Sequence, residues 1–464
     1  MIRFFHTYFP ARTLLLGISE AVLIAAAFVA ATFARLGRND ASLMLNYGQG
    51  FLKILIVAAV FVLCMYYFDL YDSFILSNRR EVVTRLVQVL GTVCILLALL
   101  YFLFPHLDLG RGIFSIGLVF VALILFAWRR LFLAVNTMPQ FAERTLILGD
   151  GPLAKSLVEE IESRKELGIR VVGQLRQIEN GDVRYASLSN EEQFEALSRQ
   201  VESYRAGRII IAMSERRGRL PVEALLRLKG RGIQIQDGAD VYEAITGKVP
   251  LENLRLSWLL FSPSFRVSRP LLLYKRAFSC LISIVCLTVG APFMILAAIA
   301  IRLDSKGPII FKQKRVGEGG KLFTLYKFRT MIDGADQDDN YRPAEKTDDR
   351  FTRVGRLLRR TRIDELPQAF NILKGDMYFV GPRPFVQNQE LECVEKIPYY
   401  RQRWSVKPGA TGWAQINRGY CVTLEDNVEK LAYDLFYIKN ISIGLDLLIM
   451  FRTLKILLLG RGSR

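Results

Sequence analysis

Four long apolar segments occupy the first 130 residues and constrain the fold more than any other feature of the sequence. Residues 13–34 contain a single charge, Glu20, and residues 54–68, 86–107 and 112–128 contain none. Each segment is about long enough to cross roughly 30 Å of hydrocarbon as a helix, the second with help from Phe51, Leu52 and a Lys53 that reaches back to water. The sequence therefore predicts a four-helix transmembrane bundle over residues 1–140.

Basic residues at the segment ends predict the orientation of this bundle. One set of ends carries Arg3, Arg12, Arg79, Arg80, Arg85, Arg129 and Arg130, and the opposite set carries only Arg35, Arg38 and Arg111. The richer side is expected to be cytoplasmic. No small-residue cleavage site follows the first segment, so we interpret that segment as an anchor. The N-terminus and all residues after 130 would then face the cytoplasm.

Two charge features need an interpretation. Glu20 is costly inside a span, so it either faces a partner or an aqueous gap, or lies near a helix end from which it reaches water. The net charge of +18 suggests nucleic acid at first. Because the basic residues alternate with apolar runs, we favour attraction to anionic lipid and to a phosphorylated substrate, with no nucleic-acid partner.

Residues 141–250 change to alternating strands and helices. Apolar strands are predicted at 145–148, 171–173, 208–212 and 233–235, which indicates a small α/β, Rossmann-like domain. Gly149, Gly151 and Ala154 match the pattern that lets a pyrophosphate approach a helix start, but no acidic residue follows the second strand to hold a ribose. A bound dinucleotide and another nucleotide or sugar ligand remain open, and we favour a degenerate structural or regulatory domain.

A proline-containing linker at residues 251–274 precedes a fifth apolar segment. Residues 277–301 carry no charge, and Ala291 and Pro292 lie near their middle. Proline removes a helix hydrogen bond and kinks a helix, so this segment can enter one leaflet and return. A plain fifth span is the alternative, but it would place all later residues outside, away from nucleotide substrates.

Several short motifs follow this segment. They are Tyr326-Lys327-Phe328-Arg329, Arg362-Ile363-Asp364-Glu365-Leu366-Pro367, Val380-Gly381-Pro382-Arg383-Pro384, and Val406-Lys407-Pro408-Gly409-Ala410-Thr411-Gly412-Trp413-Ala414-Gln415. Adjacent carboxylates beside basic residues, close to a helix that dips into the membrane, indicate chemistry on a phosphorylated lipid at the bilayer surface.

In their order, these motifs closely resemble the bacterial sugar transferases, the monotopic phosphoglycosyltransferases that initiate exopolysaccharide or O-antigen synthesis. The resemblance covers residues 275–464, and the regions ahead of it resemble the large members of that family. It implies a third domain, a mixed α/β monotopic catalytic domain over 275–464, with a re-entrant membrane helix at 275–302 that breaks at Ala291 and Pro292. Ser279 and Ala410 depart from the family pattern, away from the acidic pair.

The resemblance also implies a reaction at the inner membrane. Sugar-1-phosphate passes from a UDP-sugar to polyprenyl (undecaprenyl) phosphate through a phospho-aspartyl intermediate, with release of UMP and with Mg²⁺ as cofactor. Asp364 would be the nucleophile, and Glu365 its acidic partner at the metal. The implied substrate-binding residues are Arg315, Lys327, Arg329, Arg362, Pro382, Arg383, Pro384, Lys407 and Gln415. UDP-glucose or UDP-galactose is favoured, and a homodimer is expected by analogy.

Elementary chemistry agrees with these roles and leaves alternatives for single residues. A carboxylate is a reasonable nucleophile for phosphoryl transfer if cations offset its repulsion from phosphate. Asp364 could instead cap a helix, Lys327 and Arg329 could be solvated charges on a strand, and Lys407 could be a surface lysine. The Pro-Arg-Pro sequence could be a rigid turn. The ordered motifs favour catalysis by the acidic pair.

A non-enzymatic membrane sensor is the competing class of function, with the α/β domain binding a ligand and the C-terminal domain degenerate. A polytopic transferase with active residues between spans is a third hypothesis. The intact acidic pair, in a region that otherwise reads as soluble, argues against both. The final apolar stretch, residues 441–459, is predicted to be an amphipathic helix at the membrane interface or packed on the catalytic domain.

Overall fold

The fold was analysed in a computed structural model of the chain. It describes residues 2–4, 7–9, 11–71, 79–136, 142–164, 167–175, 189–216, 219–251, 268–335, 349–418 and 423–458, so most of the predicted linker lies outside the described residues. Beyond the N-terminal residues, which include two short paired strands, β1 (Ile2–Phe4) and β2 (Thr7–Phe9), the chain forms two compact units that divide between Val241 and Tyr242.

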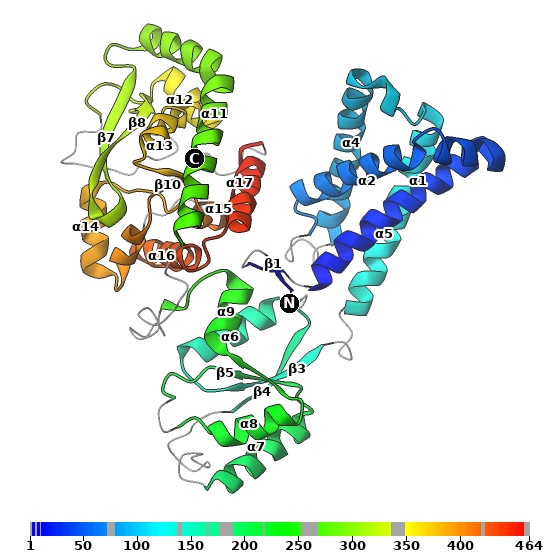
Figure 1. Ribbon diagram of the computed structural model, residues 1–464, viewed down its shortest axis with the longest axis vertical. Helices are drawn as coiled ribbons and strands as arrows, with labels where there is room; N and C mark the ends of the chain where they lie inside the picture. The colour runs from blue at the N-terminus through cyan, green and yellow to red at the C-terminus, as the bar shows by residue number, and fades with distance from the viewer. Residues whose placement is uncertain are drawn as a thin grey trace. The chain divides into compact units, whose positions relative to one another are not determined.

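Four long helices account for the predicted apolar segments, drawn in blue to cyan in Figure 1. They are α1 (Ala11–Asn46), α2 (Gly50–Tyr67), α4 (Arg79–Leu103) and α5 (Arg111–Asn136), with a short 3-10 turn, η1 (Pro105–Leu107), between the last two. Each is long and apolar enough to cross a membrane. The first runs past the predicted end at Arg35 and is interrupted at Gly37, whose φ of 77° is outside the helical range.

Glu20 has a charged partner inside the helix bundle. Its carboxylate is fully buried, and Arg129 Nε and Nη2 donate to its two oxygens at 2.6 and 3.0 Å. Arg129 Nη1 also donates to the carbonyl oxygen of Leu70 at 3.0 Å. The forked geometry joins α1 to α5 and satisfies a charge pair that hydrocarbon would otherwise penalise. The alternative, a Glu20 that reaches water, is wrong.

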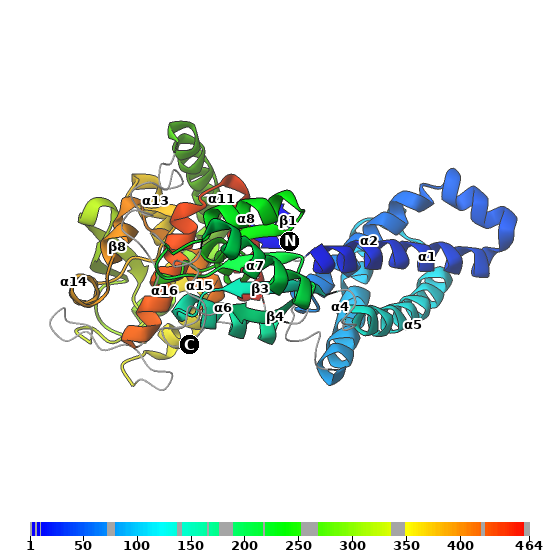
Figure 2. The ribbon, with the colours of Figure 1, turned by 90° about the horizontal axis from the view of Figure 1, so that it is seen from below.

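The α/β region has the predicted parallel sheet. Its strands β3 (Glu143–Leu148), β4 (Ile169–Leu175), β5 (Arg208–Ile211) and β6 (Gln234–Asp237) are ordered β4-β3-β5-β6. The helices are α6 (Pro152–Ser163), α7 (Asn190–Tyr204), α8 (Val222–Gly230) and α9 (Gly238–Thr246). Figures 1 and 2 show α7 and α8 on one face of the sheet and α6 on the other, so both faces are covered.

The glycine turn after β3 lies against the loop that follows β5. Gly149 has a φ of 132°, and a Cβ there would be 2.5 Å from the carbonyl oxygen of Ala212. A Cβ on Gly151 would be 2.1 Å from Ser214 Oγ, and Gln174 Nε2 donates to the carbonyl oxygen of Gly149 at 2.9 Å. The glycines therefore permit close contact between neighbouring protein loops at the place where related sheets bind ligands.

The C-terminal unit is built on one long helix and several short elements. They are α11 (Arg269–Asp304), β7 (Ile310–Val316), η7 (Glu318–Gly320), β8 (Leu322–Phe328), α12 (Arg353–Thr361), η9 (Ile363–Glu365), α13 (Gln368–Lys374), β9 (Tyr378–Val380), α14 (Gln387–Lys396), η10 (Tyr400–Ser405), β10 (Gly409–Thr411), α15 (Trp413–Asn417), α16 (Leu424–Lys439) and α17 (Ile443–Leu458). Strands β7 and β8 form an antiparallel hairpin, and β9 pairs with β10 in parallel.

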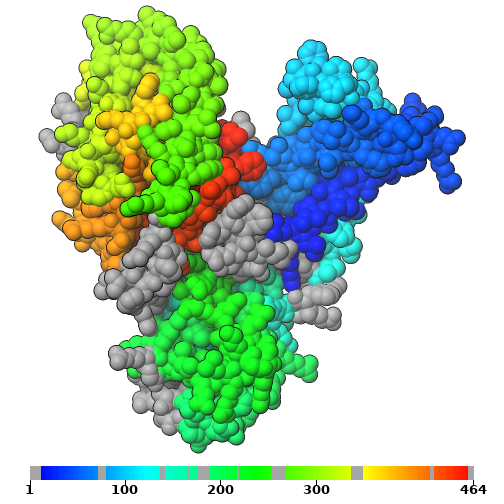
Figure 3. All heavy atoms as spheres, in the orientation of Figure 1, coloured from blue at the N-terminus to red at the C-terminus, as the bar shows by residue number. Residues whose placement is uncertain are grey.

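Helix α11 packs against this unit along its length. Its buried residues, Lys275, Ser279, Ser283, Gly290, Ala297 and Ile301, recur at helical spacing and line one face. The other face exposes Leu281, Val289, Phe293 and Leu296, among others, and Figure 3 shows the green side chains of α11 at the surface of the unit. The break predicted at Ala291 and Pro292 is wrong as an interruption of the helix, because both residues lie inside one continuous α11. One face is thus adapted to protein and the other to hydrocarbon.

A buried charge cluster fastens the start of α11 to the end of the chain. Lys275 Nζ donates to Asp446 Oδ2 and to Tyr437 Oη, both at 2.6 Å, and Tyr437 donates to Asp446 Oδ1 at 2.7 Å. Burial raises the pKa of Asp446, although Lys275 opposes the shift. Helix α17 therefore packs on the unit by this face, while Leu447, Phe451 and Leu454 remain exposed on its other face.

Removing one partner of the Glu20–Arg129 pair is expected to destabilise the bundle. Glu20→Gln leaves a buried guanidinium without its counter-charge, which should cost about 3–5 kcal/mol and lower the melting temperature in detergent. The double variant Glu20→Gln/Arg129→Met should recover part of that loss. Arg130→Met, which alters the exposed neighbour, is the matched control and should change little. Equal melting temperatures for Glu20→Gln and wild type would contradict the role of the pair.

Candidate active site

The acidic pair lies in the short turn η9, between α12 and α13. Thr352 caps the first turn of α12 through the N–H of Gly355, and Arg362 ends that helix with a φ of 60°. The reversal that follows brings Asp364 and Glu365 to the turn, one helical turn ahead of α13. The predicted helix start is therefore close to the observed one, but the pair precedes α13 instead of capping it.

Glu365 is held by three cations. Its Oε1 lies 3.0 Å from Arg383 Nη2, 3.3 Å from Lys327 Nζ and 3.5 Å from Arg362 Nη1. Its side chain is 19% exposed. Burial alone would raise the pKa of Glu365, but Arg383, Lys327 and Arg362 outweigh it and hold that pKa well below its usual range. Glu365 is thus a permanent carboxylate at the centre of a cation cluster.

Asp364 has a different environment, although it is adjacent in sequence. The residue is only 7% exposed, and its Oδ1 is buried with no hydrogen-bond partner among the described residues. Burial, followed by repulsion from Glu365, raises the pKa of Asp364 to about 6, while Lys327, Arg359 and Arg362 oppose the shift. One carboxylate is therefore neutralised by ion pairs, and its neighbour retains an oxygen with no hydrogen-bond partner among the described residues.

Lys327 reaches the pair from strand β8, whose position is fixed by a buried amide. Asn371, on α13, accepts from the N–H of Tyr326 at 3.0 Å and donates to the carbonyl oxygen of Thr324 at 2.7 Å. Burial lowers the pKa of Lys327 more than the attraction of Glu365 raises it. The clamp through Asn371, which the sequence motifs did not single out, joins the strand of Lys327 to the helix that follows the acidic pair.

Arg329 is directed elsewhere. Its guanidinium is buried and donates from Nη1 to the carbonyl oxygen of Lys306 at 2.7 Å, and from Nη2 to both oxygens of Ser305. These acceptors lie at the end of α11. The structure does not bring Arg329 to the acidic pair; instead, it satisfies the C-terminal end of the long helix.

Three other predicted binding residues also contact protein groups. Arg315 Nη1 donates to the carbonyl oxygen of Pro384 at 3.2 Å. Lys407 Nζ donates to the carbonyl oxygen of Gly375 at 2.9 Å, at the far end of α13 from Asp364. Gln415 Nε2 donates to the carbonyl oxygen of Ala410 at 3.2 Å, and its Oε1 is buried without a partner among the described residues. Among the predicted cations, Lys327, Arg362 and Arg383 form ion pairs that converge on Glu365.

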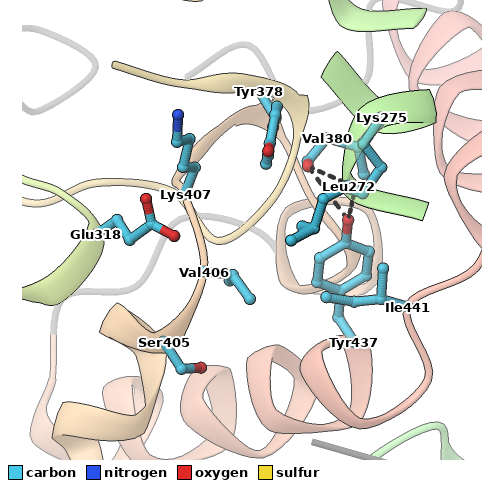
Figure 4. A pocket seen from close by; sticks show the side chains of 10 residues that line it. All are labelled: Leu272, Lys275, Glu318, Tyr378, Val380, Ser405, Val406, Lys407, Tyr437 and Ile441. Atoms are coloured by element: carbon cyan, nitrogen blue, oxygen red, sulfur yellow. Dashed lines mark hydrogen bonds between the residues drawn. The ribbon is translucent and has the colours of Figure 1, made fainter. Parts of the chain in front are cut away.

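A cavity of about 180 Å³ lies beside Lys407, away from the acidic pair. Figure 4 shows its lining, which comprises Leu272, Lys275, Glu318, Tyr378, Val380, Ser405, Val406, Lys407, Tyr437 and Ile441. Neither carboxylate of the pair belongs to this lining. The cavity is therefore separate from the charge cluster around the acidic pair.

The apolar helix contacts the acidic turn directly. A Cβ at Gly290 would lie 3.3 Å from Leu366 Cδ1, so the glycine of the Gly-Ala-Pro sequence makes room for the residue that follows the pair. Arg276, near the start of α11, donates to the carbonyl oxygens of Ile372 and Leu373 at the end of α13. Sequence patterns gave no signal for either contact, because each joins residues more than 70 positions apart.

The carboxylates fit a divalent cation only as a shared site. Within the described ranges, no group of three or more His, Cys, Asp and Glu residues could hold a metal ion. Mg²⁺ commonly binds one or two carboxylates and completes its coordination with water and substrate phosphates. Glu365, the residue predicted at the metal, supplies such a carboxylate, so it fits an Mg²⁺ ion bound together with a diphosphate.

Comparison with known proteins assigns both halves of the chain. Residues 271–460 match the bacterial sugar transferase family, and residues 66–235 match a CoA-binding domain. The chain is 41% identical over 187 residues to the exopolysaccharide production protein PSS of Rhizobium leguminosarum bv. phaseoli, covering 39% of this chain and 94% of that protein.

Two longer relatives match over larger segments. A UDP-N-acetylgalactosamine-undecaprenyl-phosphate N-acetylgalactosaminephosphotransferase of Aeromonas hydrophila is 40% identical over 227 residues, 48% of this chain and 52% of that protein. An undecaprenyl-phosphate glucose phosphotransferase of Komagataeibacter xylinus is 35% identical over 365 residues, 75% and 65% of the respective chains. The chain thus spans between half and two thirds of the length of these two relatives.

Asp364→Asn is expected to stabilise the fold at high pH. The folded pKa of about 6 lies above the ordinary value of 3.8, so stability falls as pH rises from about 4 through 6 and the penalty persists above 6. Asn removes that buried charge and should raise the free energy of unfolding by about 1–2 kcal/mol at pH 8, and by much less at pH 4. Denaturation of both proteins in detergent at the two pH values measures this. A variant less stable than wild type at pH 8 would show that ionised Asp364 supports the fold.

Proposed function

This chain belongs to the bacterial sugar transferase family, and we propose that it transfers sugar-1-phosphate from a UDP-sugar to polyprenyl phosphate, which initiates synthesis of an exopolysaccharide or O-antigen. The observation that carries the proposal is the unlike pair of carboxylates: Asp364 with an unpartnered buried oxygen, and Glu365 fixed by three cations. Two relatives are named for undecaprenyl-phosphate hexose phosphate transfer, which supports the same chemistry.

The proposed reaction has two displacements at one phosphorus atom. An ionised carboxylate oxygen of Asp364 attacks the phosphorus that bears the sugar, the bond from that phosphorus to the oxygen of UMP breaks, and UMP leaves. A phosphate oxygen of the lipid then attacks the phospho-aspartyl group, and Asp364 departs as a carboxylate. The product is a polyprenyl diphosphate sugar. Because attacking and attacked groups are both anionic, the nearby cations must offset the repulsion.

Each cation has a distinct expected role. Arg383 presents a planar fork suited to phosphate oxygens, and Lys327 presents a point charge beside the same carboxylate. Arg362, the most exposed of the three at 35%, is the one best placed to meet an arriving diphosphate. Glu365 would hold Mg²⁺ together with the diphosphate, and the ion would supply further charge neutralisation. When the diphosphate binds, some of the cations that pair with Glu365 would then turn to the phosphate oxygens.

We further propose that α11 is re-entrant and that the transferase unit lies on the cytoplasmic face of the bacterial inner membrane. Residues at both ends of α11, from Lys275 to Ile301, pack on the same unit. A helix that crossed the bilayer would separate those ends by the membrane. The buried face of α11 therefore supports a helix that dips into the membrane from one side without crossing it, and the exposed apolar face of α17 supports contact with the same surface.

The proposal also covers the α/β domain, the oligomeric state and the sugar. The contact between the Gly149 turn and the loop at Ser214 favours a structural or regulatory role for the α/β domain. A homodimer remains our expectation from the family. For the sugar, the names of the two relatives add UDP-N-acetylgalactosamine to UDP-glucose and UDP-galactose.

The function is tested by UMP release. Membranes containing the full chain should release UMP from one of those three UDP-sugars only when polyprenyl phosphate is supplied for turnover. Asp364→Asn should lower the rate by at least about 1,000-fold, because an amide is a poor nucleophile. Asp349→Asn, which changes an exposed carboxylate of the same unit, is the matched control and should retain activity. An active Asp364→Asn variant would exclude the nucleophile, and inactive wild type with all donors would favour a non-enzymatic sensor.

The topology is tested by labelling single cysteines from each side of the membrane. Lys229→Cys in the α/β domain and Lys374→Cys at the end of α13 should both react only from the cytoplasmic side. Arg38→Cys, in the part of α1 that follows Gly37, should react only from outside. If Lys374→Cys reacts from outside while Lys229→Cys does not, α11 crosses the membrane and the re-entrant proposal fails.

A further inference from the structure

The Pro382-Arg383-Pro384 turn is held through its carbonyl groups. Proline has no N–H, so two of its three residues cannot donate a backbone hydrogen bond. The carbonyl oxygen of Pro382 accepts from the N–H of Gly409 at 2.9 Å, that of Arg383 from Arg403 Nη2 at 2.9 Å, and that of Pro384 from Arg315 Nη1 at 3.2 Å. The conformation of the turn therefore depends on donors from other elements.

Arg403 is the most constrained of these donors. Its side chain is 3% exposed, and its Nε donates to Asp434 Oδ2 at 2.8 Å. Its Nη1 donates to Glu390 Oε1 at 3.0 Å and to Tyr400 Oη at 2.6 Å. Two carboxylates from α14 and α16 thus fix one side of the guanidinium, and its remaining nitrogen is directed at the carbonyl oxygen of Arg383.

Arg403 holds the backbone of Arg383, and the side chain of Arg383 reaches the acidic pair. Arg383 Nη2 lies 3.0 Å from Glu365 Oε1. We propose that Arg403 is a positioning residue that sets the aim of the Arg383 guanidinium toward Glu365 and the substrate phosphate. The expected effect on the reaction rate rests on the proposed transferase function. The expected effect on the conformation of the turn does not.

Lysine cannot replace this arrangement. The guanidinium contacts Asp434, Glu390 and the Arg383 carbonyl group from three different nitrogens in one plane, whereas an ammonium group has one nitrogen. In Arg403→Lys, the ammonium group can pair with the buried carboxylates, but it then loses the hydrogen bond to the turn. Alternatively, it can keep that hydrogen bond, but it then loses its contacts with the carboxylates. A displacement of about 1 Å in a phosphate-binding group is enough to lower a rate by roughly 100-fold.

The structural part is tested by hydrogen exchange in the full chain. Arg403→Lys should accelerate amide exchange in the peptide covering residues 378–386 and leave helix α12, residues 353–361, unchanged. Arg401→Lys, an exposed arginine in the same 3-10 helix, is the matched control and should change neither. Uniform acceleration across both peptides would assign Arg403 to general stability of the core and overturn the proposal.

The kinetic part is tested by a double-variant cycle on UMP release, with rates expressed per folded protein. Arg403→Lys alone should lower kcat/KM about 10- to 100-fold. In an Arg383→Ala background the same substitution should have no more than about a twofold effect, because the side chain it aims is absent. Equal factors in both backgrounds would show that Arg403 does not act through Arg383.

The two readouts separate failure of this inference from failure of the proposed function. Inactive wild type would reject the transferase assignment, and the exchange experiment would still decide whether Arg403 fixes the turn. If Arg403→Lys does not fold, Glu390→Gln provides the second variant, since it weakens one contact of the guanidinium and keeps the shape of its side chain. It should show the same peptide-specific exchange, and unchanged exchange at residues 378–386 would overturn the proposal.

Discussion

The site depends on three cations that converge on one carboxylate. With Arg383, Lys327 and Arg362 around its Oε1, Glu365 stays ionised inside a partly buried cluster, and its charge in turn discourages ionisation of Asp364. The two residues are adjacent, yet their neighbours raise the pKa of Asp364 and lower the pKa of Glu365. Neutral pH lies above the pKa of about 6, so Asp364 carries its charge there at a cost in stability. A buried group kept at such a cost is typical of functional sites.

The sequence predicted the parts of this molecule that rest on local pattern. Uncharged segments identified the four apolar helices, apolar runs identified the four strands of the parallel sheet, and motif order identified Asp364 and Glu365. The sequence could not tell which basic residue reaches the pair. Lys327 and Arg329 are separated by two positions on or just after β8, but the first reaches Glu365 and the second closes the end of α11. That difference is decided by what packs on each side of the strand.

Contacts between distant segments were equally inaccessible from sequence. Arg403 is one of several basic residues before the Val406-Lys407-Pro408 sequence, and nothing in its immediate neighbours distinguishes it from Arg401. In the fold, Arg403 is buried between Asp434 and Glu390, whereas Arg401 is exposed. At the Gly149 turn, by contrast, a clear sequence pattern suggested a ligand where the fold shows a contact between protein loops. Its glycines match a ligand-binding pattern, but the close approach they permit is to the loop of Ala212 and Ser214.

The apolar helix α11 supports the acidic turn directly. Gly290 receives Leu366, the residue after Glu365, and Arg276 closes the far end of α13. Arg329 closes the end of α11 from the strand that also carries Lys327. The turn with the carboxylates is therefore bounded on several sides by one helix and its partners. Since packed interfaces transmit small displacements, a shift of α11 would be felt at Asp364. In the proposed reaction, the same helix would therefore set the position of Asp364 and present an exposed apolar face to the lipid-linked acceptor.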